Sequence, residues 1–322
     1  MSARLDAWID FHGIAVELAY PSFEEDAFTA LFSAFPRAEP KSSAHAISIA
    51  LGVTDQPSEA PGPGWVPSFF YGVAQGFACG DQYLIWDGRS AIHVDIAGKR
   101  IAGALRLPDP HLTASGMQHV ALSLLLRRLG TFDLHAAGAS DGQRTLLIVG
   151  DSGAGKTTVV LSLLGAGCSF LGDDRVLIRE QHARLEVLGY PREFHVSPQT
   201  LHALGLAAPE QAAATDGKYR IDPLSYWPRG FRASSAGPLT VLLPRIADQR
   251  KSALRRVPSA ETFGRLLGSS AHVALPTLGN TEQQLQLLKS IADSAVAWEL
   301  ELGADSLETP HSLAELILRE TE

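Results

Sequence analysis

The sequence predicts an α/β protein in which a domain built around a phosphate-binding loop follows a smaller, mostly β domain. Residues 13–107 form short apolar segments separated by turn signals, and GDSGAGKT at 150–157 joins an apolar segment to a helix-compatible one. A chain of 322 residues that is 45% hydrophobic and 19% charged can bury two cores. We place the domains at residues 1–114 and 115–322.

The N-terminal domain is predicted from apolar segments that alternate with Gly, Asp and Pro. Alternation is visible at 83–86 and 92–96, as expected for half-buried strands. The aromatic residues Phe69, Phe70 and Tyr71 are expected to fill the core of this domain. The predicted strand segments are 13–20, 46–53, 65–80, 81–88, 90–98 and 100–107.

A linker at residues 107–116 leads into the second domain. Ser115 and Gln118 have the spacing of a capping box and predict a helix that Gly130 closes. Two β segments follow at 132–140 and 144–150, and Asp141-Gly142 between them is typical of a type I′ hairpin turn. The second segment runs directly into the phosphate-binding loop.

Beyond residue 174 the pattern continues to mix strands and helices. Ser197 followed by Pro198 marks a helix start, and Thr281 with Gln284 forms a second capping box. A last helix begins at Thr309-Pro310. The predicted strands of this part are 175–180, 183–190, 238–246 and 295–303.

Composition excludes several classes of protein. The formal net charge of −8, without a basic run, argues against a general nucleic-acid binder. Asp6 and Asp10 interrupt the N-terminal apolar stretch, so it is not a secretory signal, and no segment approaches the roughly twenty apolar residues of a membrane span. Cys79 and Cys168 are too few for a disulfide framework. We expect a soluble cytoplasmic protein that binds neither nucleic acid nor membrane.

The stretch at 150–157 fits the pattern G-x-x-x-x-G-K-[ST] in full. Its glycines allow backbone N–H groups to converge on phosphate oxygens, and the following helix N-terminus adds partial positive charge. Lys156 is expected on the β and γ phosphates and the Thr157 hydroxyl on Mg²⁺. The predicted nucleotide-binding residues are Gly150, Asp151, Ser152, Gly153, Ala154, Gly155, Lys156, Thr157 and Thr158.

Two adjacent carboxylates, Asp173 and Asp174, end the strand that follows the loop and its helix. A strand, loop, helix and strand of this length bring both strand ends to the same edge of a sheet, so the carboxylates are expected near the phosphates. One would bind Mg²⁺ and the other would take a proton from an attacking hydroxyl. Which carboxylate takes which role stays open, and His135 in the segment LHAAG is a further candidate.

In the order His135, hairpin, GDSGAGKT, helix and GDDRVLI, residues 134–178 resemble the catalytic domain of the HPr kinase/phosphorylase family. These bacterial enzymes phosphorylate a serine of a small carrier protein. The resemblance implies a phosphoenolpyruvate-carboxykinase-like P-loop fold with a mixed, twisted sheet. It assigns His135, Lys156, Thr157, Asp173 and Asp174 to phosphate contact, metal binding and proton abstraction.

The resemblance does not extend to the family's second signature, a Pro-Gly-Arg-Asn segment, or to its usual regulatory domain. It therefore does not imply phosphorolysis or the usual carrier substrate. The chain is more similar to HPr-kinase-related serine kinases, some of which phosphorylate precursor peptides in peptide modification such as lasso-peptide biosynthesis. ATP and Mg²⁺ are the implied cofactors, a peptide or small protein is the implied substrate, and a homo-oligomer stays open.

Other charged residues are weaker candidates. Lys218 and Arg220, after the turn at Asp216, are candidate phosphate or substrate contacts, and Arg229 and Arg232 are less favoured ones. The remaining histidines lack the spacing of a metal site, and we expect them to be structural: His93, His195, His202 and His272.

Four functions compete at this point. The first is an ATP- and Mg²⁺-dependent serine kinase acting on a peptide or small protein, and the second is a kinase of a small-molecule hydroxyl. The third, an ATP-driven assembly or transport component, is disfavoured because the chain has no LSGGQ-like signature and the strand at 238–246 ends in Pro-Arg-Ile. The fourth is a non-catalytic, nucleotide-responsive binding module, against which the lysine and both carboxylates argue.

Overall fold

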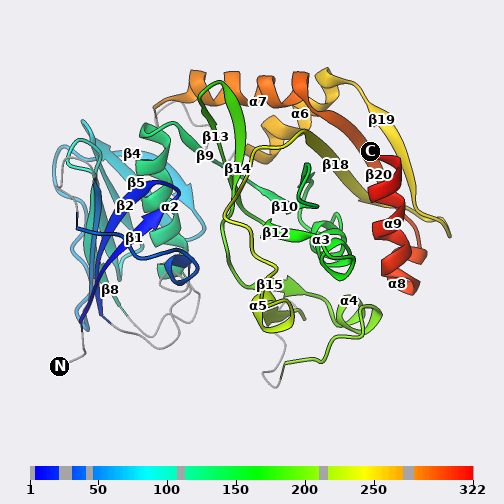
Figure 1. Ribbon diagram of the computed structural model, residues 1–322. Coiled ribbons are helices and arrows are strands. Elements are labelled where there is room, and N and C mark those ends of the chain that lie inside the picture. The colour runs from blue at the N-terminus through cyan, green and yellow to red at the C-terminus, as the bar shows by residue number, and fades with distance from the viewer. Residues whose placement is uncertain are drawn as a thin grey trace. The chain divides into compact units, whose positions relative to one another are not determined.

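A computed structural model describes residues 4–21, 31–40, 46–106, 113–209, 217–270 and 279–321 of the chain (Figure 1). The protein is a mixed α/β structure with four sheets in the described residues. Two compact units divide at Gly130, with residues 279 and 280 joining the first. Much of the expected linker, 107–112, lies outside the described residues, as do Asp216 and His272.

The first unit contains an eight-stranded sheet in the order β1-β2-β3-β8-β7-β6-β5-β4. β1 was not predicted, and the segment expected as one strand at 65–80 is a hairpin of two. The sixteen-residue helix α2 (Thr113–Arg128) packs against β7 and β8. The strands are β1 Arg4–Phe11, β2 Ile14–Pro21, β3 Ala46–Val53, β4 Val66–Tyr71, β5 Ala74–Cys79, β6 Gln82–Trp86, β7 Ala91–Asp95 and β8 Arg100–Leu105.

Two expectations for this unit need correction. α2 begins at Thr113, so Ser115 lies inside the helix and is not its N-cap. Phe69 is buried as expected, but Phe70 and Tyr71 are 75% and 41% exposed, because β4 is an edge strand of which Phe69 alone is buried. The predicted domain boundary at residue 115 falls within α2, and independent folding of two domains stays a prediction.

The second unit is organised around a six-stranded sheet in the order β12-β10-β11-β18-β20-β19. β11 pairs with β18 and β18 with β20 in parallel, whereas β10 runs antiparallel to both β11 and β12. The strands are β10 Ala136–Ser140, β11 Thr145–Val149, β12 Ser169–Gly172, β18 Leu239–Ile246, β19 Ala253–Val257 and β20 Val296–Leu302. Because β10 separates them, β11 and β12 point the same way and end at the same edge of the sheet.

Both faces of β11 are covered, which explains why its sequence TLLIV lacks alternation. Leu146 and Ile148 belong to one core cluster with α3 and α9, and Leu147 and Val149 belong to another with α6 and α7 (Figure 1). α6 and β19 were not predicted from the sequence. The helices are α3 Lys156–Gly165, α4 Pro198–Ala203, α5 Pro223–Tyr226, α6 Ser259–Ser270, α7 Thr281–Ser294, α8 Asp305–Glu308 and α9 Pro310–Glu320.

The segment predicted as one strand at 132–140 is broken at His135. β9 (Thr131–Leu134) pairs with β13 (Val176–Gln181) in a second, four-stranded sheet, which also contains β14 (Arg184–Leu188) and β17 (Ser234–Ser235). β10 pairs instead within the six-stranded sheet. The prediction of a single strand was wrong because the segment contributes one strand to each of two sheets. His135, between the two strands, pairs in neither sheet.

The hairpin between β10 and β11 exists, but its turn is not type I′. Ser140 pairs with Thr145, which leaves four residues in the loop, and only Gly142 among them takes a positive φ, +95°. The Asp141 carboxylate accepts hydrogen bonds from the backbone N–H groups of Gln143 (2.9 Å) and Arg144 (2.8 Å). This side-chain-to-backbone turn replaces the predicted two-residue turn.

The predicted N-cap of α4 is confirmed. The Ser197 hydroxyl accepts a hydrogen bond from the backbone N–H of Thr200 at 3.1 Å, and Pro198 occupies the first helical position. α4 follows β15 (Phe194–Val196), which pairs with β16 (Tyr219–Ile221) in a two-stranded sheet. Within the residues that the structure describes, no helix is both long enough and apolar enough to cross a bilayer.

We predict that Gly172→Ala destabilises the protein by about 1–3 kcal/mol, as overpacking does. A Cβ at Gly172 would lie 2.3 Å from the carbonyl oxygen of Arg175 and 3.0 Å from that of Tyr190, and backbone cannot move aside cheaply. Urea unfolding measures the change. Gly165→Ala is the control, because no atom lies within 4 Å of its Cβ position in α3. Equal stability of the two variants would contradict this explanation.

Candidate functional site

The predicted phosphate-binding loop connects β11 to α3 and has the backbone that its glycines allow. Gly153 and Gly155 take positive φ values of +84° and +102°. A Cβ on Gly155 would also lie 2.3 Å from Cδ1 of Leu302, so the Leu302 side chain would have to shift to accommodate it. Gly155 caps α3 without a side-chain hydrogen bond among the described residues, which leaves the first N–H groups of the helix for an anion.

Lys156 is buried and turned back toward its own loop. Its Nζ donates hydrogen bonds to the carbonyl oxygens of Gly150 (2.8 Å) and Asp151 (3.1 Å) and lies 3.6 Å from Oδ1 of Asp174. A buried ammonium must be paired to be tolerated. Lys156 therefore ties the loop that follows β11 to the carboxylate that follows β12.

His135 lies at the break between β9 and β10, beside the same lysine and next to Asp174. Its Nδ1 is 2.9 Å from the carbonyl oxygen of Asp174, and its Nε2 is 3.2 Å from Nζ of Lys156. A carbonyl oxygen can only accept, so Nδ1 carries the proton, and Nε2 turns its lone pair to the ammonium. This assignment leaves His135 Nε2 as a proton acceptor beside Lys156.

Asp173 occupies a very different environment from its neighbour. The Thr157 hydroxyl donates to its Oδ2 at 2.8 Å, while Oδ1 is buried with no hydrogen-bond partner in the part of the chain that the structure describes. Burial, and secondarily the charge of Asp174, raises the pKa of Asp173 to about 7, although Thr157 and Lys156 act in the opposite direction. Asp173 is thus a carboxyl group ready for a positive partner.

Asp174 is 53% exposed and has a positive φ of +61°, a conformation that non-glycine residues rarely adopt. The turn directs its carbonyl to His135 and leaves its carboxylate near Lys156. Backbone strain of this kind is concentrated at functional sites. The two neighbouring carboxylates are therefore separated into a buried one on Thr157 and an accessible one beside Lys156.

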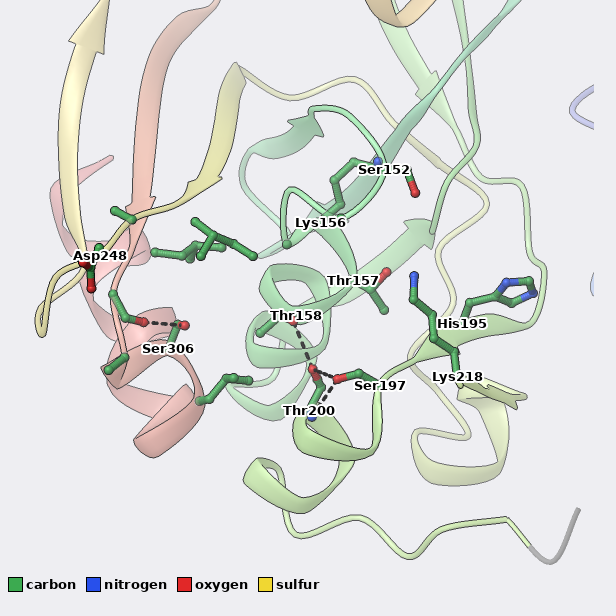
Figure 2. Close-up of a pocket in the computed structure, with 18 of the residues that line it drawn as sticks. Ser152, Lys156, Thr157, Thr158, His195, Ser197, Thr200, Lys218, Asp248 and Ser306 are labelled. Carbon is green, nitrogen blue, oxygen red and sulfur yellow. Dashed lines mark hydrogen bonds between the residues drawn. The ribbon is translucent and has the colours of Figure 1, made fainter. Parts of the chain in front are cut away.

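A cavity of about 560 Å³ opens in front of the loop, within the size range of small-molecule and cofactor pockets (Figure 2). Asp174 lines it beside the loop and α3. One side is contributed by β15, α4 and the residue before β16, and the other by the ends of β18 and β20 and the segments that follow them. Its lining residues are Ser152, Gly153, Gly155, Lys156, Thr157, Thr158, Asp174, His195, Ser197, Thr200, Lys218, 246–249, 302–304, 306 and 307.

Three of the predicted nucleotide-binding residues do not line the cavity. Gly150 and Asp151 hold Lys156 through their carbonyl groups, and the Ala154 N–H donates to the Asp151 carbonyl at 3.1 Å to close the loop. Of the weaker candidates, Lys218 lines the cavity. Arg220, Arg229 and Arg232 do not.

Sequence reasoning missed several residues that line the cavity, including His195, Thr200, Asp248 and Ser306. His195 was expected to be structural. It lies between two buried residues, Phe194 and Val196, so alternation alone could have placed it on the opposite face of its strand. The surface that this face meets depends on packing between distant segments.

Comparison with known proteins adds little. No family model matches the chain, and no curated protein matches it in sequence. Among solved structures, the HPr(Ser) kinase/phosphatase from Coxiella burnetii superposes with a TM-score of 0.33 and 10% sequence identity, over 58% of this chain and 95% of that chain. A likeness this distant establishes neither a family nor an activity.

We predict that Asp173→Asn stabilises the Mg²⁺-free protein at pH 8 by roughly 1–4 kcal/mol but much less at pH 5. The pKa of Asp173 rises from 3.8 to about 7 on folding, so the native state holds a proton that the unfolded state has lost. Stability therefore falls as the pH rises through this window, and asparagine removes the loss. Thermal unfolding at both pH values tests this.

The control for this prediction is Asp293→Asn, a half-exposed position that pairs with Lys289 on the surface of α7. It should change stability by a few tenths of a kcal/mol at either pH. A stability difference between wild type and Asp173→Asn that does not depend on pH would contradict the raised pKa.

Proposed function

We propose that the chain is an ATP- and Mg²⁺-dependent kinase that transfers a phosphoryl group to a serine hydroxyl of a peptide or small protein. The arrangement around Lys156 carries the proposal. Its ammonium lies in the phosphate-binding loop, 3.6 Å from the Asp174 carboxylate and 3.2 Å from Nε2 of His135. A cation for phosphate and two proton acceptors thus meet at one point.

The residues that line the cavity favour one orientation of a bound nucleotide. Backbone N–H groups of the loop and the N-terminus of α3 would hold the phosphates. The half of the cavity formed by the ends of β18 and β20 and the segments that follow them contains Ile246, Leu302 and Leu307, which suit the flat apolar faces of a base. Ile246 is 71% exposed, so its side chain is accessible to a ligand in this half of the cavity.

The residues present fit Mg²⁺, a hard cation that takes oxygen ligands and often uses only one or two carboxylates together with water and substrate phosphates. The Thr157 hydroxyl and the Asp173 carboxyl, with its orphaned buried Oδ1, would hold it. No group of three or more His, Cys, Asp or Glu among the described residues could hold a metal. When bound, Mg²⁺ would offset phosphate charge and favour the ionised form of Asp173.

The chemistry follows from the separated roles of the carboxylates. The acceptor oxygen attacks the γ phosphorus, the bond from that phosphorus to the β–γ bridging oxygen breaks, and ADP leaves with the bond electrons. The hydroxyl proton passes to Asp174, which is accessible from solvent, with Nε2 of His135 as its neighbour. Asp173 is too deeply buried to reach the acceptor and serves the metal.

Two observations favour a peptide or protein acceptor over a small molecule. The cavity volume of about 560 Å³ suits a single ligand as large as a nucleotide. With the nucleotide bound, the acceptor would approach from outside the cavity. Asp174 is half-exposed, and a serine on the surface of another chain could reach it. The motif resemblance of residues 134–178 to kinases that act on serine agrees with this choice.

We predict that Asp174→Asn lowers phosphoryl transfer by about 10²–10⁴-fold, the usual contribution of a general base, while ATP binding changes little. Transfer of label from γ-labelled ATP to candidate peptides measures the rate, and fluorescence titration measures binding. Lys156→Met should weaken ATP binding itself, because it removes the buried cation from the loop.

Asp293→Asn serves again as the surface control and should keep the wild-type rate. Full activity of Asp174→Asn would exclude Asp174 as the base, and absence of ATP binding by the wild-type protein would end the kinase proposal. Label in a metabolite with none in any peptide would move the acceptor to a small molecule.

We predict that Ile246→Ser raises the KM for ATP by about three- to tenfold and leaves kcat unchanged, because an apolar contact to the base is made equally in the ground state and the transition state. Steady-state kinetics test this. The exposed Val296 on β20 does not line the cavity, so Val296→Ser is the matched control. An unchanged KM for Ile246→Ser would place the base elsewhere.

A further inference from the structure

The cavity contains a second lysine that the roles described above do not use. Lys218 immediately precedes β16 and lines the cavity together with His195 from β15. Sequence analysis could not choose between Lys218 and Arg220 as a phosphate contact. In the structure Lys218 lines the cavity and Arg220 does not.

The two-stranded sheet of β15 and β16, which Lys218 immediately precedes, packs against α3. Phe194 and Val196 from β15 and Ile221 from β16 are buried in the same core cluster as the apolar residues of α3. His195, which lies between Phe194 and Val196, therefore faces away from that core. Thr200 at the start of α4 adds a hydroxyl contact to Thr158 of α3 at 3.2 Å. The side of the cavity formed by β15, α4 and the residue before β16 thus packs directly against α3.

Charge at the phosphate end of the cavity favours a second cation. Among the described residues that line the cavity, the lysines are Lys156 and Lys218, and the carboxylates are Asp174 and Asp248. Lys156 already has Asp174 at 3.6 Å. A triphosphate brings several negative charges into this space, and the Lys156–Asp174 pair offsets little of them.

The position of Lys218 matches the end of the nucleotide where that charge is largest. Figure 2 shows Asp248 and Ser306 on one side of the cavity, Lys218 and His195 on the other, and Lys156 and Thr157 between them. A nucleotide with its base in the apolar half and its phosphates on the loop would extend its terminal phosphate toward Lys218.

We propose that Lys218 contacts the terminal phosphate of the bound nucleotide and stabilises the charge on its oxygens during transfer, an inference that rests on the proposed function. As the acceptor oxygen bonds to the γ phosphorus and the bridging bond breaks, negative charge spreads over the three equatorial oxygens. Lys218 supplies positive charge to them from the wall opposite the apolar half. It donates hydrogen bonds only, and the acceptor proton still goes to Asp174.

The test compares affinities for ADP and for a non-hydrolysable ATP analogue, both with Mg²⁺, on the full chain. A charge-assisted contact to the terminal phosphate predicts that Lys218→Met lowers the preference for the ATP analogue over ADP by about ten- to a hundredfold. The affinity for ADP should change by less than about twofold. The rate of phosphoryl transfer should fall by about 10²–10³-fold, and Lys218→Arg should restore most of both properties.

Two variants serve as controls. Arg220→Met should leave the preference unchanged, because Arg220 does not line the cavity. Lys289→Met removes a surface lysine of α7 and should behave as wild type. Thermal unfolding checks that each variant is folded, and Lys218→Gln gives the same comparison if the methionine variant is not.

The outcomes separate this inference from the proposed function. An unchanged analogue-to-ADP preference in Lys218→Met overturns the contact, even if the wild-type protein proves to be a kinase. A lost preference in a protein that transfers label to no acceptor supports the contact and overturns the kinase. A wild-type chain that binds neither nucleotide overturns both.

Discussion

The buried ammonium of Lys156 is the interaction on which the rest of the site depends. Hydrogen bonds from it hold the carbonyl groups of its own loop, and it lies close to Asp174 and His135. A cation in this position is stable only if its partners are fixed in place, because removing one leaves an unpaired buried charge. The loop, the end of β12 and the break between β9 and β10 are therefore held together by one side chain.

The sheet explains how three separate segments reach that point. β10 is inserted between β11 and β12 and runs antiparallel to both, so the ends of β11 and β12 lie at the edge where β10 begins. His135 immediately precedes β10, at the residue where the chain passes from one sheet to another. The break between β9 and β10 thus positions this imidazole beside Lys156. Helices on both faces cover β11 and hold this edge rigid.

The candidate site contains groups that are costly to bury or to hold in their conformation. Asp173 is buried with an unsatisfied oxygen and a pKa of about 7, and Asp174 has an uncommon backbone conformation. Each of these features costs stability, and a bound cation would offset the cost at Asp173. Lys218 on the opposite wall has the sign of charge that a phosphate chain needs. The proposed phosphoryl transfer and the stability of the chain would therefore make opposite demands on these residues.

The sequence by itself determined the glycine-rich loop at 150–157, the paired carboxylates at the following strand end and the cap of α4, because each follows from local spacing and backbone chemistry. It could not divide 132–140 between two sheets or find β19 and α6, since the pairing partners lie far away in the chain. Nor could it distinguish Asp173 from Asp174, Lys218 from Arg220, or a structural His195 from one that lines the cavity. These residues differ in how deeply they are buried and in whether their side chains line the cavity. Both properties depend on the packing of segments that are distant in the sequence.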